Sequence, residues 1–209
     1  MLVTTVVQTI IKAPSYVWLI VTILYFIGAC IYSIPRIIKA KHEADKLRLG
    51  RDGERLVAEA LAGHDGNVLH DIQMDGFNLD HVLVSQRGIF LFETKTRTKQ
   101  SSKSEIYYDG LQLDINGFTT DEPLVQARTE AKSLQKLLAN LTGKTYQVKP
   151  VVVFPGWFIN YSKLAGSFDV AVCNPKMIET ILKGNKHPLG SEDVRIVYEA
   201  LKRYMRSSS

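Results

Sequence analysis

The chain has 209 residues, of which 45% are hydrophobic, and it carries a net charge of +5 from 26 basic and 21 acidic side chains. This length accommodates one ordinary domain and an appendage, and the charge excess is weaker than a dedicated DNA-coating protein would show. Only two cysteines occur, Cys30 in an apolar stretch and Cys173 far along the chain, which argues against a structural disulfide and a zinc site. No phosphate-binding P-loop motif supports the use of ATP.

The first segment of the chain is apolar and is predicted to cross a membrane. No charged residue occurs over residues 14–35, and about 20 apolar residues are enough to cross a bilayer. Tyr16, Trp18 and Tyr32 lie near the ends of this stretch, where amphipathic aromatic side chains favour the headgroup region. We therefore expect a membrane anchor over residues 1–35, with the span at about residues 14–35, in a single-pass protein of the cell membrane.

The charges that flank this span predict its orientation. Five basic residues follow it closely, namely Arg36, Lys39, Lys41, Lys46 and Arg48. Only Lys12 and the amino terminus precede it, so the positive-inside rule predicts that the rest of the chain is cytoplasmic. An alternative is that the Ile-Gly-Ala-Cys segment ending at Cys30 resembles a bacterial lipoprotein cleavage box, which would place the domain outside the cytoplasm. The apolar residues before Lys12 and the basic residues after Cys30 favour the span.

Two helical segments and a strand are predicted after the span. Residues 36–47 are charged and are expected to form a helical linker. Residues 53–61 place apolar side chains at helical spacing, and Gly63 is expected to end that helix. Residues 67–72 are predicted to form a strand.

A hairpin is predicted next. Two short apolar runs, residues 78–84 and 88–95, are joined by Ser-Gln-Arg-Gly, a short link whose glycine suits a turn between antiparallel strands. Residues of a strand alternate between its two faces, so Glu93 and Lys95 project from the same side. The hairpin brings Asp80, near the start of one strand, beside Glu93, near the end of the other.

This convergence of two carboxylates and a lysine has chemical consequences. Hard oxygen ligands with incomplete protein coordination suit Mg²⁺, and an adjacent ammonium steadies a water nucleophile or the charge of a phosphate. His81 is adjacent to Asp80 in the strand and therefore points to the opposite face. We expect His81 to be a structural histidine rather than a ligand.

The second half of the chain predicts further strands and helices. Residues 96–104 are polar and are expected to form a loop, and a small hairpin is expected around Asp109-Gly110. A long helix is predicted from Pro123 to about Leu141, with Gly143 as its stop signal. The remaining predicted elements are strands at 148–154 and 170–173 and helices at 175–182 and 191–205. This order predicts an α/β fold, with a mixed central sheet flanked by helices.

Four short motifs follow one another along the chain. They are Gly-x-x-Gly-Glu from Gly50, Asp-His-Val from Asp80, Gly-Ile-Phe-x-x-Glu-Thr-Lys from Gly88, and Pro-Leu-x-Gln-Ala from Pro123. In this order and spacing they resemble the NERD (nuclease-related domain) family, a branch of the PD-(D/E)XK nuclease-like superfamily. The resemblance covers about residues 48–155 and implies a nuclease domain with a restriction-endonuclease-like core over residues 48–209. Leu79 stands where the superfamily name has a proline.

The resemblance implies roles for individual residues. Asp80 and Glu93 would be metal ligands, joined by the backbone carbonyl of Thr94, and Lys95 would be the catalytic lysine. Glu54 would be the helix carboxylate that reaches the metal directly or through water. The implied cofactor is Mg²⁺, with Mn²⁺ as its expected substitute.

Further candidates lie downstream of these residues. Gln126 is a catalytic candidate from the later helix, with an ordinary helix-surface amide as the alternative. Arg97, Lys99 and Lys103 follow the site and are candidates to contact the phosphates of a nucleic acid, with a solvated loop as the alternative.

The expected function is that of a membrane-anchored, Mg²⁺-dependent endonuclease that hydrolyses phosphodiester bonds of DNA. A homodimer is a further expectation, because cutting both strands usually calls for two active sites. The alternative is a non-catalytic nucleic-acid-binding or membrane-tethered interaction module on a nuclease-like fold, since function does not follow from fold.

Overall fold

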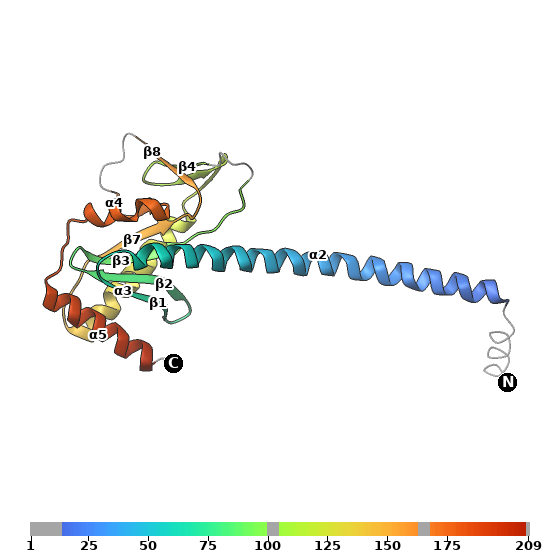
Figure 1. Cartoon of the computed structure of the whole chain (residues 1–209), viewed down its shortest axis with the longest axis horizontal. Coiled ribbons are helices and arrows are strands. Elements are labelled where there is room, and N and C mark those ends of the chain that lie inside the picture. The colour runs from blue at the N-terminus through green and yellow to red at the C-terminus, as the bar shows by residue number, and fades with distance from the viewer. Residues whose placement is uncertain (1–13, 100–104, 163–167, 208–209) are drawn as a thin grey trace. The chain divides into compact units, whose positions relative to one another are not determined.

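The computed structural model describes residues 14–99, 105–162 and 168–207 (Figure 1). The chain divides into two compact units, Met1–Arg48 and Leu49–Ser209. The predicted fold class is confirmed, because the second unit contains mixed sheets flanked by helices and a long helix with an apolar first part lies near the N-terminus.

One helix replaces three predicted segments. The predicted span, the charged linker and the first helix of the domain are continuous in α2 (Ser15–Ala62), which contains Pro35. The linker contains three Lys and two Ala, which are strong helix formers, and it has no Gly or Pro to act as a stop signal. The apolar part of α2 is long and apolar enough to cross a membrane by length and composition, and its side chains are not buried by the protein.

Five strands form the main sheet, in the order β1-β2-β3-β7-β9. They are β1 (Asn67–Gln73), β2 (Asn78–Ser85), β3 (Gly88–Thr94), β7 (Val148–Val153) and β9 (Ala171–Cys173). The first three pair antiparallel, and β7 and β9 run parallel to β3, so the sheet is mixed. Ser85 pairs with Gly88 across the predicted turn, and the φ of +128° at Gly88 is one that glycine adopts readily.

Helices cover both faces of this sheet (Figure 1). These helices are α3 (Glu122–Thr142), α4 (Ile178–Lys183) and α5 (Ser191–Ser207), together with the last turns of α2 and a short 3₁₀ helix, η1 (Pro175–Met177). Val82 and Leu91 pack with side chains of α3 and α5 on one face. Leu83 and Phe90, one residue out of phase, pack with α4 and the end of α2 on the other. As predicted, α3 ends before Gly143, whose φ is 71°.

A second sheet of four short strands was only partly predicted. Its order is β6-β5-β4-β8, formed by β4 (Glu105–Tyr108), β5 (Leu113–Ile115), β6 (Phe118–Thr120) and β8 (Phe158–Tyr161). The predicted hairpin around Asp109-Gly110 is present as the β4–β5 pair. Strands β6 and β8 were missed, because runs of three or four residues are too short for an alternating pattern to be read. Asn116-Gly117, which connects β5 to β6 with positive φ at both residues, is a hairpin signal that could have revealed β6.

Candidate active site

The antiparallel pairing of β2 and β3 brings two carboxylates together at one end of the hairpin. The register pairs His81 with Phe92, so Asp80 and Glu93 are the next residues along the two strands. The backbone N–H of Thr94 donates a hydrogen bond to Asp80 Oδ2 at 2.8 Å. The position of the Asp80 carboxylate is therefore tied to the backbone of the residue that follows Glu93.

Lys95 lies on the same side as Glu93. Its Nζ is 2.7 Å from Glu93 Oε1, and its backbone N–H donates to the carbonyl of Val153 at 2.8 Å. Because the backbone bond ties this residue to β7, the chain is still held by the sheet beyond the last residue of β3. The sheet therefore holds in place the backbone that carries the Lys95 side chain.

Helix α3 supplies an amide that connects the site. Gln126 Oε1 accepts a hydrogen bond from Lys95 Nζ at 2.7 Å. Its Nε2 donates to Glu93 Oε1 and to Glu130 Oε1, each at 2.8 Å. Gln126 is half-buried, so the structure puts this amide among the carboxylates and not at an ordinary helix surface.

Glu130 is a site residue that the sequence analysis missed. It is only 4% exposed, and its Oε2 has no hydrogen-bond partner among the described residues. Gln126 and Glu130 are four residues apart on one helix, so their side chains lie on the same face. This spacing could have indicated Glu130 as a candidate site residue. A buried carboxylate oxygen without a partner is costly and marks a place where a proton or a cation would bind.

The electrostatics of the site follow from burial and from crowding of like charges. Burial, and then the Glu93 carboxylate, raise the pKa of Asp80 to about 7. Burial also raises the pKa of Glu93 to about 7, with the nearby Glu130 adding to the shift and Lys95 opposing it. The pKa of Glu130 is raised in turn, again mainly by burial. Three carboxylates that are largely removed from water and face a single ammonium favour a bound cation.

The last turns of α2 approach the end of β3 closely at Gly53. A Cβ added to Gly53 would lie 2.2 Å from Thr96 Cγ2 and 3.5 Å from Thr94 Cγ2. The second glycine of the Gly-x-x-Gly-Glu motif therefore permits the helix to pack against the strand that carries the site. Glu54, the next residue, is exposed, and its charge contributes to the raised pKa of Asp80.

His81 lies on the opposite face of β2 from Asp80, as the alternation predicts. It is buried, and its Nδ1 is 2.8 Å from Nδ1 of His70 on the neighbouring strand. Burial, and then the charge of His70, lower the pKa of His81 to about 4. His81 is therefore a neutral histidine of the sheet at physiological pH.

The two described basic candidates, Arg97 and Lys99, do not enter the cluster of carboxylates. Arg97 and Lys99 are exposed in the segment after β3, where the Arg97 carbonyl accepts a hydrogen bond from Trp157 Nε1. Lys103 lies outside the described residues, as does the end of the predicted loop at 96–104.

The residues of the candidate site provide some, but not all, of the ligands that a hard divalent cation needs. Among the described residues, no three His, Cys, Asp or Glu side chains are arranged to hold an ion by themselves. Mg²⁺ does not need such a cage, because it is usually bound by one or two carboxylates together with water and substrate phosphate. Asp80 and Glu93, with the backbone carbonyl of Thr94, match that kind of donor set.

The fold and this cluster of acidic residues with a lysine define a nuclease-like α/β domain. Comparison with protein families matches residues 49–155 to NERD, the nuclease-related domain. The match spans half of the chain, and the chain therefore belongs to the NERD family. It includes Asp80, Glu93, Lys95 and Gln126. Neither the comparison with curated proteins nor that with solved structures gave a match.

Proposed function

We propose that this protein is a membrane-anchored, metal-dependent endonuclease that hydrolyses phosphodiester bonds of DNA. The observation that carries the proposal is the group of half-buried Asp80 and buried Glu93 and Glu130 near Lys95. Its excess negative charge suits a bound cation, and membership of a nuclease-related family supports phosphodiester chemistry. A water nucleophile, a cation and an ammonium are the components that such hydrolysis requires.

Asp80, Glu93 and the Thr94 carbonyl would hold Mg²⁺ or, in its place, Mn²⁺. One oxygen of each carboxylate already has a partner, Asp80 Oδ2 with the Thr94 N–H and Glu93 Oε1 with Lys95. The second oxygen of each is the one that a metal would use. Such an ion supplies Lewis acidity toward the scissile phosphate. Glu54 would contribute through water or assist proton transfer.

Lys95 would orient the attacking water or stabilise the charge that develops on the phosphate. An ammonium has three N–H donors, and Glu93 and Gln126 engage two of them. One N–H is then left for the reaction. Gln126 would act as a positioning residue, because it fixes both Lys95 and the carboxylate beside it.

The substrate and the location complete the proposal. Exposed Arg97 and Lys99, with Lys103, would contact phosphates that flank the cleaved bond. The apolar part of α2 would anchor the protein in the cell membrane, and the basic residues that follow would keep the nuclease domain in the cytoplasm. Cleavage of both strands would need two such sites, so we include a homodimer in the proposal.

Substitutions that separate turnover from affinity test this function. Asp80→Asn and Lys95→Ala should each abolish cleavage of a DNA substrate while its dissociation constant changes by less than about threefold, because binding relies mainly on other phosphate contacts. Single-turnover cleavage and fluorescence anisotropy measure the two quantities. A non-catalytic module would instead show no cleavage in the parent protein and unchanged or tighter binding in Asp80→Asn.

A further inference from the structure

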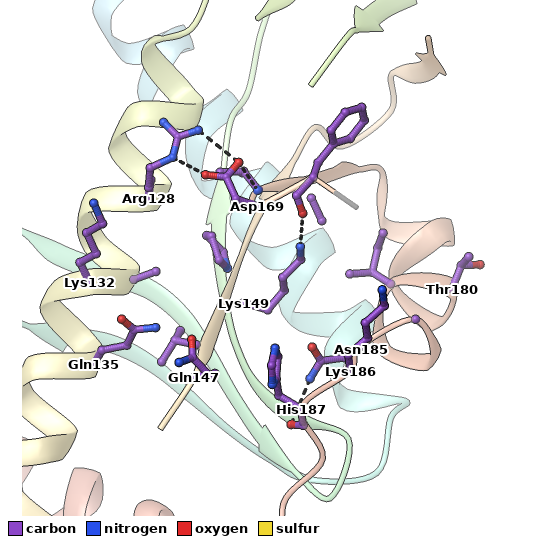
Figure 2. A pocket seen from close by; sticks show the side chains of 18 of the residues that line it. Arg128, Lys132, Gln135, Gln147, Lys149, Asp169, Thr180, Asn185, Lys186 and His187 are labelled. Atoms are coloured by element: carbon purple, nitrogen blue, oxygen red, sulfur yellow. Dashed lines mark hydrogen bonds and ion pairs between the residues drawn. The ribbon is translucent and has the colours of Figure 1, made fainter. Parts of the chain in front are cut away.

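A cavity of about 670 Å³ lies at the edge of the main sheet, away from the candidate active site (Figure 2). Strand β9 pairs with β7 only over the segment from Val151 to Val153. The first half of β7 therefore has β3 on one side and, among the described residues, no paired strand on the other. Helix α3, the start of β7, the residues before β9 and the segment after α4 together line this space. Its volume lies within the range of small-ligand sites.

The charged side chains that line the cavity are predominantly basic. Its cationic groups are those of Arg128, Lys132, Lys149 and Lys186, with His187 beside them. Figure 2 shows these side chains coming from several elements around one space. Asp169 is the one acidic residue among those that line it. The lining is therefore strongly unbalanced in charge.

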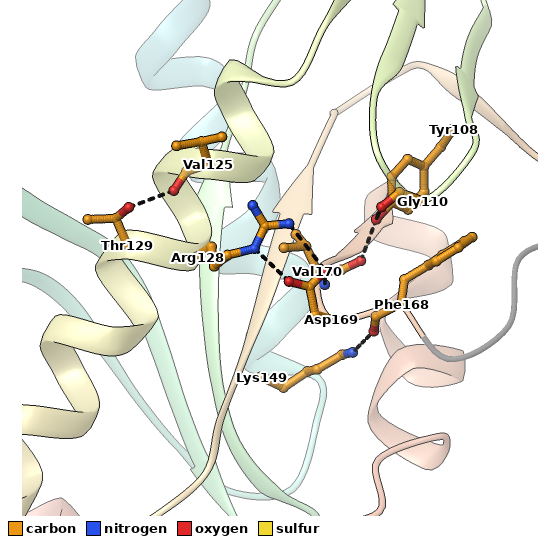
Figure 3. Close-up of polar contacts among 9 residues, drawn as sticks. All are labelled: Tyr108, Gly110, Val125, Arg128, Thr129, Lys149, Phe168, Asp169 and Val170. Atoms are coloured by element: carbon orange, nitrogen blue, oxygen red, sulfur yellow. Dashed lines mark hydrogen bonds and ion pairs between the residues drawn. The ribbon is translucent and has the colours of Figure 1, made fainter.

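The acidic residue does not offset this excess. Asp169 forms an ion pair with Arg128, in which the guanidinium Nε and Nη2 each donate to one carboxylate oxygen (Figure 3). The side chains of Lys132 and Lys186 have no hydrogen bond or ion pair with any other described residue, and both are exposed. With Arg128 paired, three lysines remain without a carboxylate partner of their own.

Lys149 is the half-buried cation of the cavity. Its ammonium donates to the backbone carbonyl of Phe168, and no carboxylate forms an ion pair with it among the described residues (Figure 3). Burial lowers the pKa of Lys149, with Asp169 partly opposing this shift. A charge removed from water without a counter-ion is costly, so an anion bound beside Lys149 would recover part of that cost.

We propose that this edge cavity binds a small phosphate-bearing molecule of nucleotide size, through Lys132, Lys149 and Lys186. A phosphate presents several acceptor oxygens and negative charge, which suits a space lined by lysines from a helix, a strand and a loop. Gln135 and Gln147 line the same space, and their side-chain amides have no hydrogen bond with another described residue, so these amides are available to the rest of the ligand. The cavity contains none of the residues of the candidate nuclease site.

A free small molecule fits this cavity better than a nucleic-acid strand. Proteins that bind single strands use an extended basic groove with aromatic side chains for stacking. Here the cations line one short pocket. Of the Tyr and Phe side chains in its lining, Phe168 packs on Tyr108 at 4.8 Å between centroids, and the Tyr161 hydroxyl donates to the carbonyl of Val172. Figure 3 shows the Phe168 ring pointing away from Lys149.

Isothermal titration of the full chain in detergent tests this proposal. Inorganic pyrophosphate and adenosine 5′-diphosphate are the probes, and EDTA is present so that no metal attracts phosphate to the carboxylates. Both probes should bind saturably at one site. Lys132→Glu and Lys149→Met should each weaken binding roughly tenfold or more, the loss expected for one charge-assisted hydrogen bond. Circular dichroism verifies that each variant is folded.

The matched control is Lys136→Glu, an exposed charge reversal one turn further along α3 and outside the cavity. It should change the dissociation constant by less than about twofold, because its exposed ammonium lies outside the cavity and is screened by water and salt. Equal weakening by Lys136→Glu and Lys132→Glu would overturn the proposal, because it would show attraction by net charge alone. Absence of saturable binding of both probes would overturn it too, as would binding of single-stranded DNA at this cavity that neither probe displaces.

Discussion

At the scale of single residues, the geometry of the site depends on the hydrogen bonds that the Lys95 ammonium makes with its neighbours. Lys95 donates to Glu93 and to Gln126, and Gln126 in turn donates to Glu93 and Glu130. Each contact fixes its neighbours, so the amide sets the direction of the lysine even though it need not touch the substrate. Loss of the amide should therefore affect the reaction more than the binding.

Gln126→Leu tests this positioning role. Leucine keeps the approximate volume but removes both the acceptor for Lys95 and the donor for the two carboxylates. We expect kcat to fall roughly 10- to 100-fold with little change in DNA affinity, because small misplacements of reacting groups cost this much. Steady-state cleavage and anisotropy measure the two effects. Asn140→Leu, an exposed substitution on the same helix, is the control and should leave both unchanged.

The raised pKa of Asp80 predicts a pH dependence of stability. Its folded pKa is about 7 against an ordinary value of 3.8, so between these values the folded protein binds more protons than the unfolded chain. The contribution to stability is complete below about pH 4 and is lost as the pH rises through about 7. In EDTA, the unfolding free energy of the parent should therefore fall relative to Asp80→Asn by on the order of 4 kcal/mol over this interval.

Thermal unfolding at pH 5 and pH 8 measures this difference. At pH 8, Mg²⁺ should stabilise the parent protein and not the Asp80→Asn variant, because the ion competes with the proton for the same carboxylate. Parallel stability profiles for the two proteins would show that Asp80 titrates as an exposed carboxylate.

At the scale of elements, the approach of α2 to the end of β3 depends on a small residue. Gly53→Ala brings a Cβ within 2.2 Å of Thr96 Cγ2, so either the side chain turns or the helix shifts. We expect a loss of about 1–3 kcal/mol in unfolding free energy, as for other overpacked sites. Gly50→Ala meets nothing within 4 Å and should stabilise by up to about 1 kcal/mol, because alanine is the better helix former. Thermal unfolding compares the two, and equal effects would contradict this packing.

The hairpin could be predicted from the sequence, whereas features that depend on how elements pack together could not. The hairpin of β2 and β3 and the convergence of Asp80, Glu93 and Lys95 follow from local alternation and a short turn, and both were predicted. Glu130 was missed because its place beside Glu93 results from docking of α3 on the sheet, which no local pattern encodes. The cavity beside Lys149 was not predicted either, since it exists only because β9 is shorter than β7.

At the scale of the whole molecule, the apolar helix predicts an integral membrane protein. Residues 14–35 carry no charge, and the cost of removing about 20 apolar residues from a bilayer makes insertion effectively irreversible. The full chain should sediment with membranes and resist both high salt and alkaline carbonate. A version that lacks residues 1–35 should be released to the soluble fraction. Release of the full chain by carbonate would indicate peripheral attachment.

The central claim is that the Asp80–Glu93–Lys95 cluster is a metal-dependent nuclease site. Its most direct test is cleavage of supercoiled plasmid by the purified full chain in Mg²⁺, in Mn²⁺ and in EDTA, with Lys95→Ala beside it. We predict nicking with either metal, none in EDTA, and none by Lys95→Ala at equal DNA binding. Failure of folded, DNA-binding protein to cut in either metal would contradict the claim, as would cleavage by Lys95→Ala at the parental rate.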